Sequence, residues 1–276
     1  MDLPAGGGYV DPNFPNPQKP QDARIIIYGY TPSFALCITA IVVFTLSFVA
    51  HLVQVIKYRT WYFVPLSVAC VMEIVGYVLR SLSAKSDPYN LPYFIVQYFF
   101  IIVAPVLISA SIYVCLTKLI EWAHHEGFKT DRLKPKLILW GFIGADVVTT
   151  IAQVAGAALI GSAESNRKSP DVPNDIVLAG LAFQTFAFTI FLVVFVVLSV
   201  QVRSAFRSIG VFVVALLVSS LLVYLRTIFR LAETSQGVFG YLMVHEALFA
   251  ALEFVPIVVA VCILAIFHPG RMLGRN

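Results

Sequence analysis

Charged residues are scarce in this sequence: Asp, Glu, Lys and Arg together make up 12% of its 276 residues. Soluble domains contain about 25%, so the composition argues against a soluble fold. Hydrophobic residues make up 59% instead. The sequence therefore predicts an integral membrane protein. Its net charge of +4 comes from loop cations that set topology, and no nucleic-acid partner is expected.

Cysteines and sorting signals are also few. All four cysteines fall within apolar runs, so no disulfide framework is expected, and no Asn-x-Ser/Thr sequon occurs. Residues 1–29 are rich in Pro and Gly, and they lack a basic stretch followed by an apolar one. We expect this segment to be a disordered extracellular tail without a cleavable signal peptide.

Seven apolar runs have about the 20 residues that a helix needs to cross a bilayer. Backbone groups in lipid need internal partners, and the runs lack the alternation of barrel strands, so we predict helices. The predicted fold class is all-α integral membrane, a seven-transmembrane helix bundle over residues 30–270 with a short cytoplasmic tail at 271–276. The runs are 33–56, 61–80, 93–117, 136–160, 176–202, 209–229 and 240–267.

The distribution of Lys and Arg predicts the orientation. With the N-terminus outside, eleven of these residues face the cytoplasm and eight face outward. The loop "TKLIEWAHHEGFKTDRLKPK" supplies five of the eleven. Because cytoplasmic loops carry the excess of Lys and Arg, the expected topology is N-out/C-in.

Several ionisable side chains lie inside the apolar runs. Such a group costs about 2.5–3.5 kcal/mol at mid-bilayer on insertion scales, so each needs a partner or a wet cavity. Glu73 in the second run is followed at i+4 and i+7 by Tyr77 and Arg80, and Asp146 in the fourth is followed at i+7 by Gln153. Residues seven apart share one helix face. Glu246 and Glu253 show the same spacing, and His51 and Gln184 add polar groups in the first and fifth runs.

The stretch "VYLRTIFRLAETSQGVFG" places Arg226, Arg230 and Glu233 on one helical face near the end of the sixth run. We interpret the arginines as counter-charges for an inward-facing acidic cluster, with Arg226 expected to pair with Glu246. Two interpretations of the polar groups remain. They are either interhelical contacts worth about 0.6 kcal/mol each, or the lining of a functional cavity. Three mid-membrane carboxylates with too few cations nearby favour the cavity.

Missing motifs exclude some seven-helix functions. The last run has no Schiff-base lysine for retinal, and no phosphate-binding Gly-rich Lys loop occurs. The motifs of rhodopsin-like receptors are replaced by "CLTKLIEW" and "VCILAIFHPG". A zinc hydrolase needs several intramembrane histidines, but His124 and His125 fall in a predicted loop and His268 at an end, which leaves His51 and His245. A metal-dependent lipid hydrolase and a lipid-sensing receptor with a basic third loop remain alternatives.

The segments "GYVLR", "IIVAPVLISASIYVCL", "ADVVTTIAQVAGAAL", "LRTIFRLAE" and "FHPGRML" resemble the fungal lipid-translocating exporter family, the RTA-like proteins of aminosterol resistance. The resemblance extends from about Tyr30 to Leu273. It implies a multi-pass protein of the plasma membrane, or alternatively the vacuolar membrane, that exports sphingoid long-chain bases or other toxic amphiphiles. One branch is associated with porphyrin traffic. Glu253 departs from the Asp expected there. The matching polar positions are His51, Glu73, Arg80, Asp146, Gln153, Gln184, Arg226, Arg230, Glu233 and Glu246.

Together these observations predict a translocator of a lipid or amphiphile that confers resistance, not an enzyme, with no cofactor or metal and an undetermined oligomeric state. A carboxylate cluster would attract the amine of such a substrate, and apolar walls would accept its chain. Glu73, Asp146 and Glu253 are expected to form the head-group site, with Arg226 and Glu246 as an outer gate. The predicted substrate-binding residues are Glu73, Asp146, Glu253, Gln153, Gln184, Glu246, Arg226, His51 and Tyr77, and Arg80, Arg230 and Glu233 are predicted to form gate or structural ion pairs.

Overall fold

The computed structural model describes residues 9–14, 22–23, 25–127, 134–165, 171–202, 206–237 and 240–272. Seven helices in these ranges are long and apolar enough to cross a membrane, as predicted. The first six spans are α1 (Phe34–Tyr58), α2 (Val64–Lys85, preceded by the 3₁₀ turn η1 at Trp61–Phe63), α3 (Leu91–His125), α4 (Pro135–Ser165), α5 (Asp171–Gln201) and α6 (Phe206–Ser235).

The seventh span is divided into several elements. It begins with α7 (Glu246–Leu248), continues as the π-helix η3 (Phe249–Phe254), and ends with α8 (Val255–Ile266) and α9 (Pro269–Met272). Pro256 lies in the first turn of α8. Because proline lacks a backbone N–H, regular α-helical bonding cannot continue through it, and the wider π-turn lies immediately before it.

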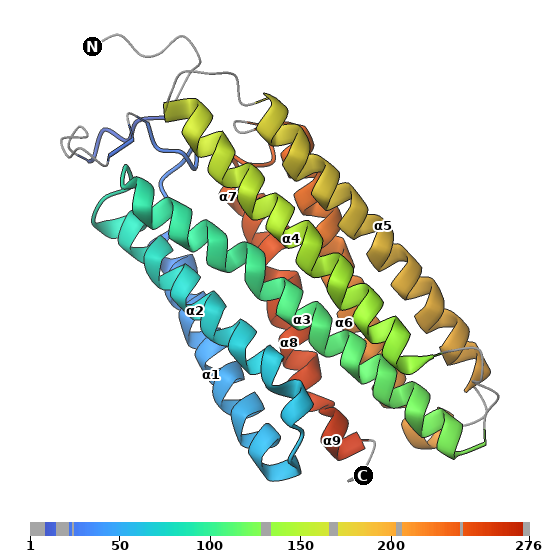
Figure 1. Ribbon diagram of the computed structural model, residues 1–276. Coiled ribbons are helices and arrows are strands. Elements are labelled where there is room, and N and C mark those ends of the chain that lie inside the picture. Colours follow the sequence, from blue (N-terminus) through green and yellow to red (C-terminus); the bar gives the residue numbers. More distant parts are fainter. Residues whose placement is uncertain are drawn as a thin grey trace.

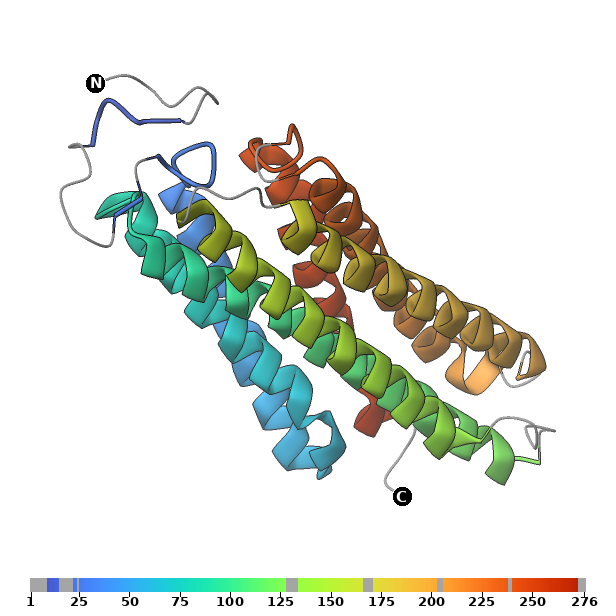
Figure 2. The ribbon, with the colours of Figure 1, turned by 45° about the horizontal axis from the view of Figure 1, so that its top comes forward.

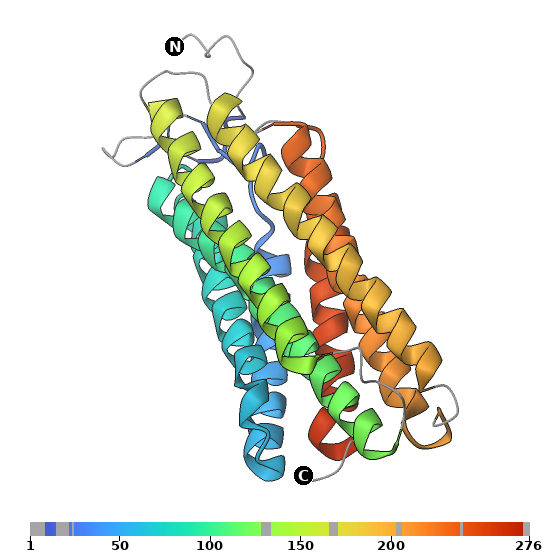
Figure 3. The same ribbon diagram turned by 45° about the vertical axis from the view of Figure 1, so that its right-hand side comes forward.

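The helices run side by side along one axis, with α3 between α2 and α4 (Figure 1). Figure 2 shows α5 and α6 along the side opposite α1 and α2. Figure 3 shows the seventh span between α1 and α6, both of which contact α8. In the most apolar 18-residue stretch of α3, 61% of the stretch is buried inside the bundle, against 17% in the corresponding stretch of α4. The third helix is therefore the centre of the bundle, and the fourth lies at its edge.

Three predicted helix boundaries are wrong by six residues or more. The third helix continues to His125, because Leu119, Ile120 and Ala123 are buried on its inner face. His124 and His125 therefore lie in the last helical turn rather than in a loop. The sixth helix also continues past the predicted end at 229, and the seventh span begins at Glu246 rather than at 240. All four cysteines are free.

Described residues before α1 pack against the start of α3. Ile26 and Tyr28 are buried with Tyr89, and the Ala23 N–H donates to the Tyr89 carbonyl over 2.8 Å. The Ser33 hydroxyl accepts from the Leu36 N–H and caps α1. Disorder over residues 1–29 stays a prediction.

The contact between α4 and α5 depends on Gly156. A methyl group at this position would lie 2.5 Å from Val177 Cγ2 and 3.1 Å from the Pro173 carbonyl oxygen, whereas a methyl group at Gly141 would have nothing within 4 Å. We expect Gly156→Ala to lower the free energy of unfolding by about 1–3 kcal/mol, the usual range for overpacking. Gly141→Ala is the matched control and should be neutral or stabilising by up to about 1 kcal/mol. Unfolding of both variants in detergent micelles tests this, and equal effects would contradict it.

Candidate functional site

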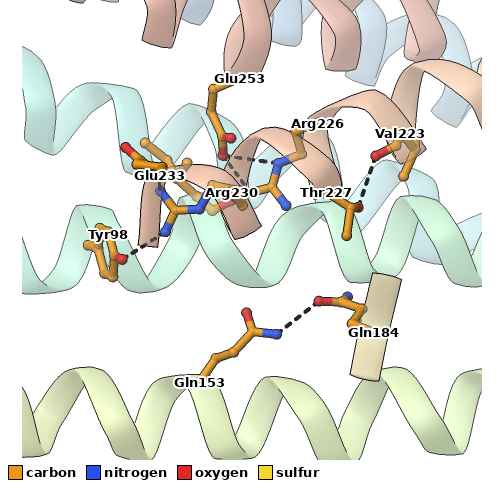
Figure 4. Close-up of polar contacts among 10 residues, drawn as sticks. Tyr98, Gln153, Gln184, Val223, Arg226, Thr227, Arg230, Glu233 and Glu253 are labelled. Atoms are coloured by element: carbon orange, nitrogen blue, oxygen red, sulfur yellow. Dashed lines mark hydrogen bonds and ion pairs between the residues drawn. The ribbon is translucent and has the colours of Figure 1, made fainter. Parts of the chain in front are cut away.

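Three charged residues from three elements meet in the interior of the bundle. Arg226 of α6 donates from Nε to Glu253 Oε1 of η3 over 3.0 Å, and its Nη2 reaches the same oxygen over 2.5 Å. Both residues are buried, with exposed fractions of 7% and 2% (Figure 4). The predicted pairing of Arg226 with Glu246 is therefore wrong.

Arg226 also contacts the backbone of the central helix. Pro105 lies inside α3 and has no N–H to offer the carbonyl of Ile101, four residues earlier. The Arg226 Nη2 donates to this carbonyl over 3.1 Å. An unsatisfied backbone group is costly in the apolar interior of a membrane protein. The Arg226 guanidinium therefore pairs with the Glu253 carboxylate and also supplies the hydrogen-bond donor that Pro105 lacks.

Glu73 of α2 is the third member of this central cluster. It is 3% exposed and interacts electrostatically with Arg226 and Glu253. No hydrogen bond or ion pair joins its carboxylate to another described residue. Two buried carboxylates thus share one arginine. Tyr77, one turn along α2, packs its ring against Phe44 and Phe254 and forms the apolar wall beside the cluster.

Arg230 forms a second ion pair one helical turn beyond Arg226. Its Nη1 donates to Glu233 over 2.6 Å and its Nη2 donates to the Tyr98 hydroxyl over 2.7 Å. Figure 4 shows this pair beside the Arg226–Glu253 pair. The pairing of Arg230 with Glu233 within α6 accounts for the extension of this helix beyond its apolar run.

Arg80 of α2 forms the third ion pair, with Glu246 at 3.6 Å. Its Nη2 also donates to the Tyr30 hydroxyl over 2.6 Å, and its guanidinium lies 4.3 Å from the centre of the Phe249 ring. Burial raises the pKa of the Tyr30 phenol, so the hydroxyl is neutral when it accepts this bond. Glu246 accepts from the Ser33 N–H over 2.8 Å and thereby joins the start of α1 to the seventh span.

The predicted pairing of Arg226 with Glu246 failed because of the local structure of the seventh span. The prediction treated Glu246 and Glu253 as two turns apart on one α-helical face, but η3 lies between them and its i→i+5 bonding includes more residues per turn. The two side chains therefore contact different arginines. Arg226 is bound to Glu253, and Glu246 is bound to Arg80.

Asp146 does not join this central cluster. Its Oδ2 accepts from the Tyr113 hydroxyl over 2.9 Å, between α3 and α4. Gln153 of α4 donates to Gln184 of α5 over 2.8 Å. In Figure 4 this amide pair lies across the α3 ribbon from the arginines. The structure thus brings together two of the three predicted acids, Glu73 and Glu253.

His51 is also separate from the charged cluster. Its Nε2 lies 3.1 Å from the Val261 carbonyl, and Gln54 donates to the Ala265 carbonyl over 2.8 Å. Both contacts join α1 to α8, as expected for interhelical packing. His245 contacts the Tyr241 carbonyl over 2.7 Å. No group of three or more His, Cys, Asp or Glu in the described ranges is placed to hold a metal ion.

A small cavity of about 30 Å³ lies beside the outer ion pairs. Arg80, Gln97, Tyr98, Arg230 and Glu233 line it, together with Phe249. This volume suits one water-sized group, whereas pockets for drug-sized ligands have about 300–1,000 Å³. A long-chain amphiphile does not fit inside this cavity.

Sequence reasoning missed the neutral partners of the arginines. The position of Pro105 could have identified the Ile101 carbonyl, because the carbonyl four residues before a proline in a helix lacks its usual donor. No sequence signal distinguishes Tyr30 and Tyr98 from the other tyrosines of the chain. Gln54 was also overlooked as a contact of α8.

Comparison with known proteins finds one matching family model and several similar proteins from Saccharomyces cerevisiae. The sequence model of a family described as "RTA1 like protein" matches residues 66–276. Sphingoid long-chain base transporter RSB1 of Saccharomyces cerevisiae is 27% identical over 289 residues, which covers 90% of this chain and 75% of the relative. Protoporphyrin uptake protein 1 of the same yeast is 27% identical, with coverage of 92% and 94%. Protein RTM1 is 28% identical, with coverage of 77% and 68%. No solved structure matches the chain.

Proposed function

Since this chain belongs to the RTA1-like family, we propose that it moves amphiphiles with a cationic head group, such as sphingoid long-chain bases, outward across a membrane. The name of the yeast sphingoid long-chain base transporter, which is similar over 90% of the chain, supports this substrate class. We further propose the N-out/C-in topology, placement in the plasma membrane, and a role in resistance to toxic amphiphiles.

The cluster of Glu73, Arg226 and Glu253 carries the proposal. At full ionisation it holds two negative charges and one positive charge, and Glu73 has no direct partner among the described residues. A substrate ammonium beside Glu73 balances the charges, because Arg226 remains bound to Glu253. In a membrane interior this match favours a cation over a neutral or anionic head group. The apolar helix faces accept the hydrocarbon chain.

The other polar residues take different roles in this mechanism. Asp146, Gln153 and Gln184 connect α3, α4 and α5 through their side-chain contacts. The outer ion pairs, Arg80–Glu246 and Arg230–Glu233, close the route on the side of the N-terminal segment. Outward release then requires these pairs to separate, which is the proposed gate.

Reconstitution of the purified protein tests this function. Vesicles that contain the protein should move a labelled long-chain base between leaflets faster than protein-free vesicles. The same base with an acetylated, uncharged nitrogen should move at the protein-free rate, because it cannot balance Glu73. Equal rates for the charged base with and without protein would contradict transport, and binding without movement would favour a lipid-sensing receptor.

A further inference from the structure

Among the described acids of the bundle interior, only Asp146 has no arginine beside it. It is 2% exposed, and no described cation pairs with it or interacts with it electrostatically. A buried carboxylate without a counter-charge is stable only when it binds a proton or meets a cation. The other interior acids each have an arginine as partner or neighbour: Glu73, Glu233, Glu246 and Glu253.

Neutral groups from both neighbouring helices face the Asp146 carboxylate. The helix α4 packs against α3 and α5. From α3, the Tyr113 hydroxyl donates to Oδ2 over 2.9 Å, and from α5 the Gln184 amide interacts with the carboxylate. Tyr113 is the only titratable group among the described residues that acts on Asp146. The second oxygen, Oδ1, is buried and has no hydrogen-bond partner, so it is the atom that remains free to bind a ligand.

A proton suits this position better than a metal ion. A metal ion such as Ca²⁺ requires about six or more ligating oxygens, and no group of three or more His, Cys, Asp or Glu in the described ranges is placed to hold one. A proton needs only one lone pair of Oδ1. Its binding also removes the uncompensated negative charge, while the Tyr113 hydroxyl stays within reach of Oδ2.

Asp146 and the central cluster are attached to the same helix. Tyr113, which donates to Asp146, and Ile101, whose carbonyl accepts from Arg226, both belong to α3. Tyr113 lies about 18 Å beyond Ile101 along the helix axis, and Pro105 lies between them. Because helices bend most readily at proline, a change at one contact can alter the position of the other through α3.

We propose that Asp146 binds a proton that moves inward as each cationic amphiphile moves outward, so that the protein exchanges one for the other. Oδ1 takes up one proton when the site is open to the outside and releases it when the site is open to the inside, which regenerates the carboxylate. An inside-negative membrane potential opposes the outward movement of a cation, whereas the exchange carries no net charge. This inference rests on the proposed function and adds its energy source.

Transport into vesicles with an imposed pH difference tests the exchange. The probe is a labelled long-chain quaternary ammonium amphiphile, because its permanent charge prevents it from crossing as a neutral amine. The membrane potential is held at zero. With a lumen that is more acidic than the outside by about one pH unit, one-for-one exchange should enrich the probe about tenfold in the inner leaflet. Vesicles without protein should show no enrichment.

Variants of Asp146 assign the coupling to this residue. Asp146→Asn cannot bind the proton and should lose the enrichment, whereas Asp146→Glu should retain it. Glu121→Gln is the matched control, because it makes the same acid-to-amide change in a half-exposed pair on α3, and it should retain the enrichment. If the unsubstituted protein moves the probe without enrichment, or if Asp146→Asn still enriches it, the inference is overturned and the proposed function stands.

Infrared spectroscopy of the purified protein detects the proton without transport. The spectrum should contain a protonated carboxylic acid band that disappears as the pH rises and is absent from Asp146→Asn. Tyr113→Phe removes a donor to the ionised carboxylate and should move this titration upward by about one pH unit. A titrating Asp146 band in a protein that does not move the probe contradicts only the proposed function. The absence of such a band, or an unshifted titration in Tyr113→Phe, contradicts the inference.

Discussion

Replacing Arg226 with Met is expected to lower the free energy of unfolding by about 3–5 kcal/mol, the range observed when one partner of a buried ion pair is removed. The substitution leaves the carboxylates of Glu73 and Glu253 without their shared cation. It also removes the donor for the Ile101 carbonyl. Unfolding of the purified variant in detergent micelles measures the loss.

Two further variants separate the ion pair from general effects of the substitution. Arg226→Met combined with Glu253→Gln should recover part of the lost stability, because the second change removes a buried unpaired charge. Arg271→Met removes the same charge from an exposed position and should change stability by less than about 0.5 kcal/mol. If the double variant is as unstable as the single one, compensation between Arg226 and Glu253 is ruled out.

Replacing Glu73 with Gln is expected to slow translocation of a long-chain base by about ten- to a hundredfold. The shape of the side chain is preserved and no hydrogen bond to another described residue is lost, so folding should be nearly unaffected. What is lost is the charged partner of the ammonium, and a hydrogen bond to a charged group is worth about 1.5–3 kcal/mol. Initial rates in the vesicle assay measure the change.

The control for Glu73→Gln is Glu121→Gln. Glu121 forms a half-exposed pair with Lys118 on α3, so the same chemical change outside the central cluster should leave the rate unaltered. Glu73→Asp keeps the charge and should retain more activity than Glu73→Gln. A folded Glu73→Gln protein that transports at the unsubstituted rate would eliminate the proposed head-group site.

The sequence was sufficient for the seven spans because each is a long apolar run, and lipid permits few alternatives to a helix. The sequence was less informative where a helix extends beyond its apolar run. The end of α3 is amphipathic, with Leu119 and Ile120 buried beside polar residues, so a hydropathy argument ended the helix too early.

The ion pairs were predicted less well than the helices. The spacing argument correctly turned Glu73, Arg226 and Glu253 toward the interior, where all three are buried. It could not assign partners, because pairing depends on how helices are rotated against one another and on the π-turn at Phe249–Phe254. Asp146 shows the same limit. It is buried as expected, but its partner is the Tyr113 hydroxyl.

The bond between Arg226 and the Ile101 carbonyl links the electrostatics of the interior to the shape of the central helix. Pro105 makes α3 locally deformable at this carbonyl, and the guanidinium that braces it is also the counter-ion of Glu253. Because Arg226 remains bound to Glu253 when a substrate cation lies beside Glu73, that cation leaves this support of α3 in place. Only a movement of Arg226 itself would free the Ile101 carbonyl and allow a bend in the helix that contacts α2, α4 and α6.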